Sequence, residues 1–287
     1  MDAAAEVATG VELIHPARFL FNAGSTPKAW NEKMLNDAHF KVMHYEEDAS
    51  KVFANTDIKG GIAITYQDSQ NEFEPIVVFT KYPELNNILH KVKRHSDFSS
   101  MDKFVITRTA YRLTEKLHQE HPEALSQLSK GHPYDMSTNI FDRLPQIFFP
   151  DMPNNGKEYI QILGRENNQR VYKYILAAYV NQPKNLNKYK IFLPSGNGNG
   201  TFGETLTAPV LGIPGVGSTE TFISLGCFNT EKEAENLLKY IKCKFTRAML
   251  NVLKITQHLT PDVWKYVPLQ NFTSSSDIDW SKSIHEI

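Results

Sequence analysis

The stretch that decides the fold runs Phe40-Lys41-Val42-Met43-His44-Tyr45, passes through a polar turn, and continues as Gly61-Ile62-Ala63-Ile64-Thr65-Tyr66. Both runs are rich in β-branched and aromatic residues, which favour strands. Phe53 lies in the polar segment between them. The pattern therefore predicts two consecutive strands that form a hairpin, with an aromatic residue in the connecting loop.

The residues before this hairpin predict alternating helices and strands. Val11 to Ile14 is a short apolar run, and Thr26-Pro27 opens a helical pattern with apolar positions at Trp30, Met34 and Leu35. This order suits the second half of a doubly wound α/β sheet. The strand at 11–14 would then be an exposed edge, so we expect a tendency to form homodimers.

The polar, turn-rich segment Gln67 to Pro75 marks the expected domain boundary. We therefore predict one domain over residues 1–74 and a second over residues 75–287. In the second domain, helical patterns and short apolar runs alternate without a repeat. The expected strands lie near residues 159–163, 171–180, 189–193 and 222–225. This mixture predicts an α+β domain.

One helix is especially clear in the sequence. Thr230-Glu231-Lys232-Glu233 is a capping-box pattern, and apolar residues recur after it at helical spacing as far as Val252. The pattern predicts a single long helix. Its opposite flank would carry either a solvated face or a track for DNA, formed by Lys239, Lys242, Arg247 and Lys254.

Composition and charge describe an ordinary globular chain. It has 41% hydrophobic and 22% charged residues and a net charge of −1. No apolar run approaches the roughly 20 residues of a membrane span, and no secretion signal is visible. The two cysteines suit free thiols in a reducing cytoplasm. His118 and His121 lack partners at metal-ligand spacing, so we expect no metal.

Two polar segments are candidate DNA contacts. Gly164 to Arg170 contains Arg165, Asn167, Asn168 and Arg170, and arginine suits guanine or phosphate while asparagine suits adenine. A plain polar hairpin turn explains the same residues. The loop Ser195 to Gly203 contains Asn197 and Asn199, which suit either DNA contact or a flexible loop. A cofactor phosphate is disfavoured there because no helix follows the loop.

Several segments carry a resemblance to a known family. They are Pro16 to Phe21, Val52-Phe53, Asn55 to Gly61, Ser137 to Phe141, Gly212 to Gly215, Thr256-Gln257 and Val267-Pro268-Leu269. The chain resembles the C-terminal part of adenine-specific DNA methyltransferases of restriction–modification systems, including their target recognition domain, which is similar to type I specificity subunits. The resemblance implies that Phe53 stacks against a flipped adenine. Alternatively, Phe53 is an ordinary core residue.

The family's cofactor and catalytic motifs are not found in this sequence. Its members bind S-adenosylmethionine through a Gly-containing loop and hold the adenine amine with Asn-Pro-Pro-Tyr. The family order would place both motifs upstream of Met1. The resemblance thus implies a partial Rossmann-like methyltransferase sheet followed by a mixed α+β target recognition domain, with no cofactor bound by this chain. The expected partners are double-stranded DNA and the missing N-terminal half.

Two alternatives stand beside a DNA-recognition module that is inactive alone. The chain could be one part of a split methyltransferase that is active with a partner. It could also be a non-DNA-binding interaction protein, or a relic whose half-sheet pairs with itself.

Overall fold

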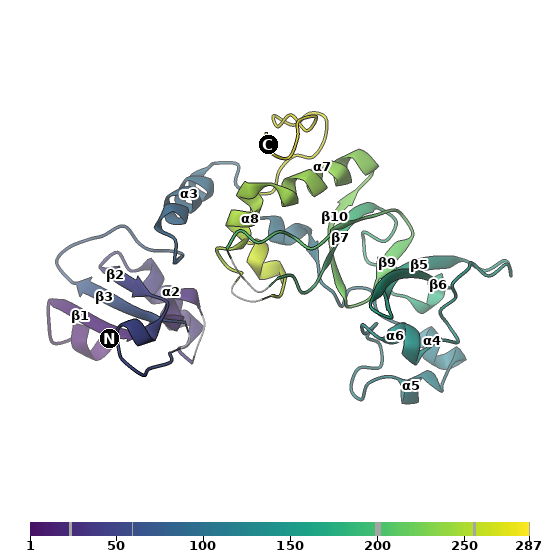
Figure 1. The fold of residues 1–287 in the computed structure, drawn as a ribbon, viewed down its shortest axis with the longest axis horizontal. Helices are drawn as coiled ribbons and strands as arrows, with labels where there is room; N and C mark the ends of the chain where they lie inside the picture. Colours follow the sequence, from purple (N-terminus) through teal and green to yellow (C-terminus); the bar gives the residue numbers. More distant parts are fainter. Residues whose placement is uncertain (23–24, 59, 199–201, 255–256, 287) are drawn as a thin grey trace. The chain divides into compact units, whose positions relative to one another are not determined.

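The chain is mixed α/β and forms two compact units, Met1–Lys91 and Val92–Ile287. A computed structural model describes residues 1–22, 25–58, 60–198, 202–254 and 257–286 (Figure 1). The boundary between the units falls within a helix, α3 (Pro83–Arg94), rather than in the polar segment before residue 75. No helix among the described residues is long and apolar enough to cross a membrane.

The first unit is built on a three-stranded sheet. Its elements before α3 are α1 (Asp2–Ala5), β1 (Gly10–Pro16), the 3-10 helix η1 (Ala17–Phe21), α2 (Lys28–Asn36), β2 (Phe40–Glu46), the 3-10 helix η2 (Ala49–Lys51) and β3 (Ile62–Asp68). The sheet order is β1-β3-β2, with β3 antiparallel to both neighbours. β1 and β2 therefore run in the same direction and are connected through η1 and α2, a helical crossover of the kind that links parallel strands.

One face of this sheet carries the core of the first unit. Phe19, Met34, Phe40 and Ala63 are all buried in one apolar cluster. Because side chains alternate along a strand, Ile64 lies on the face opposite Ala63. Its partner on β1 is Ile14, which is 52% exposed. β1 thus forms an edge of the described sheet, as the sequence predicted, and the face bearing Ile14 is open.

The second unit contains two further sheets. The four-stranded sheet has the order β4-β10-β7-β8 and the three-stranded sheet has the order β6-β5-β9. Their strands are β4 (Val105–Ile106), β5 (Tyr159–Glu166), β6 (Gln169–Leu176), β7 (Tyr189–Pro194), β8 (Val210–Gly212), β9 (Val216–Ser218) and β10 (Phe222–Phe228). The pairings are antiparallel apart from that of β5 with β9.

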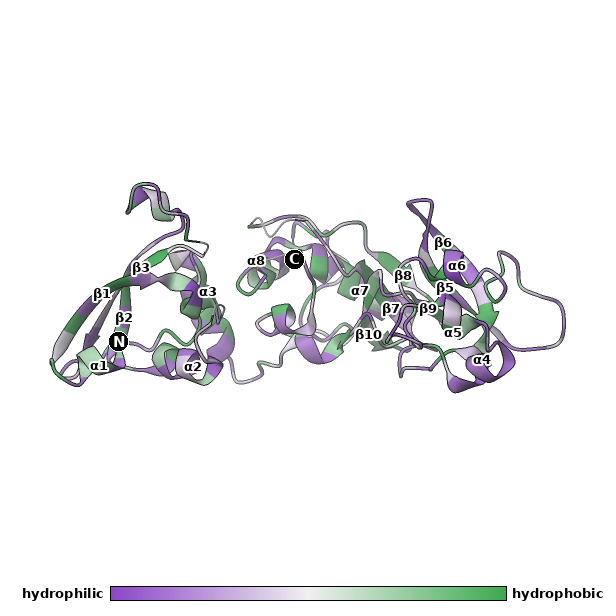
Figure 2. Cartoon of the chain, turned by 90° about the horizontal axis from the view of Figure 1, so that it is seen from below, coloured by the Kyte–Doolittle hydropathy of each residue, from purple (hydrophilic) through white to green (hydrophobic). Residues whose placement is uncertain are grey.

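Short helices accompany these sheets. They are α4 (Glu115–Glu120), α5 (Ala124–Gln127), α6 (Ile140–Arg143) and the 3-10 helices η3 (Met101–Phe104), η4 (Ala177–Tyr179) and η5 (Pro261–Trp264). α4 is mostly hydrophilic in Figure 2 and buries only Leu117 and His118. One continuous apolar cluster includes Phe141 of α6, Ile162 of β5 and Phe222 of β10. The core therefore joins residues of both sheets.

The long helix predicted after Thr230 is two helices. α7 (Glu231–Lys242) begins with the predicted capping box, and α8 (Lys244–Leu250) follows directly. Cys243 between them has φ −67° and ψ 158°, and its buried sulfur accepts a hydrogen bond from the Thr246 amide. The prediction of a single helix is wrong, because the extended backbone of Cys243 ends one helix and starts another. The apolar residues keep a similar spacing on both sides of it.

A lysine is buried in the centre of the second unit. Lys190 of β7 is fully buried, and its Nζ donates to the carbonyl oxygens of Leu186 at 2.8 Å and Ile213 at 2.9 Å. Burial lowers the pKa of Lys190 to about 7. The neutral amine is the form that this apolar position favours.

This lysine should make stability depend on pH. Because the pKa of Lys190 is lower when folded, the unfolded chain binds more protons between about pH 7 and the ordinary lysine pKa. The free energy of unfolding should therefore rise with pH from about 7 to 9.5, by up to about 1.4 kcal/mol per pH unit. Urea unfolding at several pH values measures this slope. Lys190→Met should flatten it, and an unchanged slope in that variant would contradict the assignment.

Candidate nucleic-acid interface

The hairpin β5–β6 is closed by a two-residue turn. Glu166 pairs with Gln169, and Asn167 and Asn168 between them have φ of 47° and 62°. Two consecutive left-handed residues match the twist of a β-hairpin, and asparagine is among the few side chains that tolerate this conformation. The polar hairpin considered from the sequence is thus present. Both asparagines are exposed at its tip.

The register of this hairpin places two arginines directly opposite each other. Arg165 of β5 pairs with Arg170 of β6. Directly opposed like charges destabilise a sheet, and their Cβ atoms lie roughly 5 Å apart in such pairs. The adjacent acid does not neutralise them, because Glu166 accepts from Lys173 Nζ at 2.5 Å. Among the described residues, neither arginine forms a salt bridge with a carboxylate.

Each guanidinium is instead held by a backbone carbonyl. Arg165 Nη2 donates to Asn168 O at 3.1 Å, and Arg170 Nη1 donates to Ala208 O at 2.6 Å. The Arg170 guanidinium also lies 5.5 Å from the centre of the Phe222 ring. Because a guanidinium has five N–H donors, these contacts orient both groups and leave donors for an anion.

A tyrosine extends this polar face. Tyr172 lies two residues after Arg170 on β6, and therefore on the same face of the hairpin, and is 41% exposed. Burial raises the pKa of Tyr172, and Arg170 opposes that shift. The phenol therefore stays neutral and can donate a hydrogen bond at physiological pH. Tyr172 is not among the residues predicted from the sequence, although the spacing Arg170-x-Tyr172 already puts both residues on one face of a strand.

The other face of the hairpin is fixed to the core. Gly164 packs so closely on Phe141 of α6 that a Cβ atom there would lie 2.5 Å from the ring. The Lys173 ammonium lies 5.2 Å from the centre of the same ring. These contacts pack the hairpin against the core, so the arginine pair lies on the face turned away from Phe141.

One of the two predicted contacts in the loop after β7, Asn197, is buried. Asn197 is 2% exposed, accepts from the Thr207 amide at 2.5 Å and donates to Thr205 O at 3.3 Å. Its side chain is bonded to Thr205 and Thr207 and is buried, which contradicts its predicted contact with DNA. Asn199 lies outside the described residues.

The four basic residues predicted to lie on one flank of the C-terminal helices do not form a shared exposed surface. Lys254 is 3% exposed, donates to Asn197 O at 2.8 Å and forms an ion pair with Glu204. This burial contradicts its predicted contact with DNA. Lys239 and Arg247 donate to backbone carbonyls, and Lys242 alone of the four is exposed. The cause is tertiary: distant segments of the chain cover the helical face.

Phe53 in the first unit is a surface residue. It is 46% exposed in the loop between β2 and β3, so it is not an ordinary core residue. Both ends of the loop are anchored. Glu46 pairs with Lys51 at 3.2 Å, and Tyr45 donates to Gly60 O at 3.3 Å. Gly61 has φ +76°, and a Cβ there would lie 2.4 Å from Glu46 O. The aromatic ring is therefore presented by a constrained loop.

Comparison with known proteins adds no family assignment. No protein-family model matches the chain, and no curated protein sequence matches it. Among the described residues, no group of three or more histidine, cysteine, aspartate or glutamate side chains could hold a metal ion. The hairpin and Phe53 are therefore the candidate functional features of this chain.

Removal of either arginine should weaken binding to duplex DNA. Arg165→Ala and Arg170→Ala should each lower affinity about three- to tenfold and reduce the slope of log K against log salt concentration by about 0.9 per lost phosphate contact. Fluorescence anisotropy over a salt series measures both quantities. Arg108→Ala, which removes another exposed arginine, is the matched control. Equal affinity of all four proteins would exclude the hairpin from the interface.

Phe53 should contribute to binding of an unpaired adenine. Base–aromatic stacking is worth about 1–3 kcal/mol per base. Phe53→Ala should therefore reduce, by about fivefold or more, the preference for a duplex with an unpaired adenine over a fully paired duplex. Val52→Ala changes the neighbouring exposed apolar side chain and should leave that preference intact. The same loss in both variants would show a general effect of the loop.

Proposed function

We propose that this chain is the DNA-recognition portion of an adenine-specific DNA methyltransferase of a restriction–modification system. The observation that carries the proposal is the opposed pair Arg165 and Arg170 on a hairpin packed against the core. Arg165 is exposed and Arg170 is half-buried, and neither has a carboxylate partner among the described residues. The repulsion between the two guanidinium groups destabilises the free protein. An anion that binds between them would offset this repulsion. The class of enzyme in this proposal comes from the resemblance of several sequence segments to adenine-specific DNA methyltransferases.

The shape of the hairpin supports this proposal. A two-stranded β-ribbon fits the major groove of B-DNA, where arginine reads guanine and asparagine reads adenine. Arg165 and Arg170 would bind guanine edges or phosphates, and the exposed turn amides of Asn167 and Asn168 would contact neighbouring bases or sugars. Lys242 is a further exposed cation that can contact phosphate. Phe53 would stack against the adenine once it has left the helix.

A second candidate function is one chain of a split methyltransferase. The unpaired edge of β1 and the exposed side chain of Ile14 favour it, because an open strand edge is a surface on which another chain can pair. In this arrangement a partner chain covers that face. The partner supplies S-adenosylmethionine binding and the catalytic tetrapeptide, and this chain selects the DNA site.

Selection from a randomised duplex library tests the first function. The chain is incubated with the library at moderate salt, and the retained DNA is sequenced. We expect an enriched motif that contains adenine, and we expect Arg165→Ala/Arg170→Ala to lose the enrichment while remaining folded by circular dichroism. No retention by the folded wild-type chain would contradict the proposal. Retention of DNA without an enriched motif would indicate contact with phosphates only. It would favour the second candidate function, in which a partner chain is needed for sequence recognition.

A further inference from the structure

The outer edge of β1 has no strand partner among the described residues. β1 pairs with β3 alone, and β2 forms the opposite border of the sheet. An unpaired strand edge presents backbone donors and acceptors to which another chain can bond. The outer edge of β1 is therefore a place where a second polypeptide can extend the sheet.

The hydrogen bonds at the two ends of the β1–β3 ladder show which residues point outward. Ala17 N donates to Gly61 O at 3.0 Å, and Ser69 N donates to Thr9 O at 2.9 Å. Because bonded and non-bonded pairs alternate along an antiparallel ladder, the odd-numbered residues of β1 bond to β3. The backbone groups of the even-numbered residues point away from the sheet, and these residues are Gly10, Glu12, Ile14 and Pro16.

The residues of this edge favour one register for pairing with a second copy. Pro16 offers a carbonyl oxygen but no N–H, so it suits only the end of a new ladder. Pairing Glu12 with Glu12 of the second copy would place like charges opposite each other, which is destabilising. A register centred on Leu13 avoids both conflicts, because Glu12 then faces Ile14 and Gly10 faces Pro16.

We propose that this chain forms a symmetric dimer through antiparallel pairing of β1 with β1 of a second copy. Glu12 exchanges backbone hydrogen bonds with Ile14 of the second copy, and the Gly10 N–H donates to its Pro16 carbonyl. The two three-stranded sheets then become one continuous sheet. Such a two-fold arrangement, in which the same surface of both copies meets, is the commonest in homo-oligomers.

The proposed dimer is independent of DNA recognition, because it uses only groups of the first unit. It also gives the β1 edge an occupant other than the unlike chain of the second candidate function. A single strand pair buries less surface than the roughly 1,200–2,000 Å² of stable interfaces, so we expect weak association in the micromolar range.

Sedimentation equilibrium of the full chain over a wide concentration series tests the pairing. We expect a reversible equilibrium between monomer and dimer. Ile14→Lys places an ammonium group opposite Glu12 of the second copy and should strengthen association about two- to tenfold, because opposite charges attract across strands. Ile14→Glu opposes two carboxylates and should weaken association by a similar factor. If the exposed apolar side chain of Ile14 caused association, both variants would weaken it.

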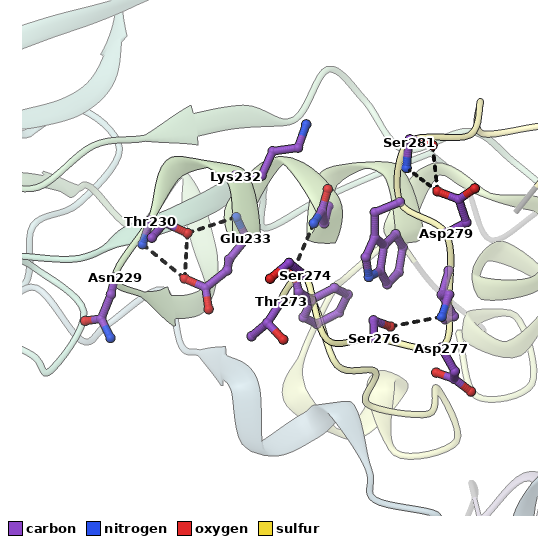
Figure 3. Close-up of a pocket in the computed structure, with 14 residues that line it drawn as sticks. Asn229, Thr230, Lys232, Glu233, Thr273, Ser274, Ser276, Asp277, Asp279 and Ser281 are labelled. Atoms are coloured by element: carbon purple, nitrogen blue, oxygen red, sulfur yellow. Dashed lines mark hydrogen bonds between the residues drawn. The ribbon is translucent and has the colours of Figure 1, made fainter.

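Matched controls change the same charges in the second unit. Asp277→Asn and Lys232→Gln alter exposed residues near the start of α7 (Figure 3) and should dimerise like wild type. Ile14→Pro removes an outward N–H and keeps the bonds to β3, since an edge strand tolerates proline on its solvent side. It should weaken association about tenfold or more while circular dichroism remains unchanged.

Cysteine cross-linking measures the register. In a Cys227→Ser background, Leu13→Cys brings two thiols together across a non-hydrogen-bonded pair, where Cα atoms are about 4.5 Å apart and a disulfide can form. Val11→Cys is the control, because its two copies would lie roughly 13 Å apart along the strands and should not cross-link. Monomer at every concentration, equal cross-linking of both variants, or dissociation by Ile14→Lys would each overturn the proposal.

Discussion

The opposition of Arg165 and Arg170 is the constraint on which the proposed recognition surface depends. It follows from the register of β5 and β6, which the left-handed turn at Asn167 and Asn168 sets. A one-residue change of register would turn one arginine toward Phe141 and the core. The close packing of Gly164 on that ring keeps the register unique. Core packing on one face therefore determines which charges meet on the other.

The repulsion between Arg165 and Arg170 lowers the stability of the free protein and favours the binding of an anion. Two guanidinium groups across a strand pair repel each other, and their backbone contacts orient them without neutralising them. Natural proteins retain such a conflict where function uses it. Phe53 shows a similar conflict in the first unit, because a large apolar ring is held at the surface by an anchored loop. The arginine pair and Phe53 are thus the two places where the chain departs from ordinary folding preferences.

Local patterns were predictable from the sequence, and tertiary relationships were not. The strands β2 and β3, the capping box of α7 and the turn at Asn167 are encoded by neighbouring residues. The burial of Lys254 depends on Glu204, 50 positions earlier in the chain. Asn197 is buried because it holds Thr205 and Thr207. The break at Cys243 has no glycine or proline to signal it. That Arg165 and Arg170 face each other could be established only from the register of β5 and β6, although their equal distance from the turn suggested this pairing.

The most direct test of the arginine pair is a double-mutant cycle on duplex DNA. Affinity is measured for wild type, Arg165→Ala, Arg170→Ala and the double variant at one salt concentration. If both guanidinium groups hold the same anion, the losses are coupled, and the double variant loses clearly less than the sum of the single losses. Strictly additive losses would mean two independent contacts. No loss in any variant would contradict the account of this hairpin as the DNA-binding surface.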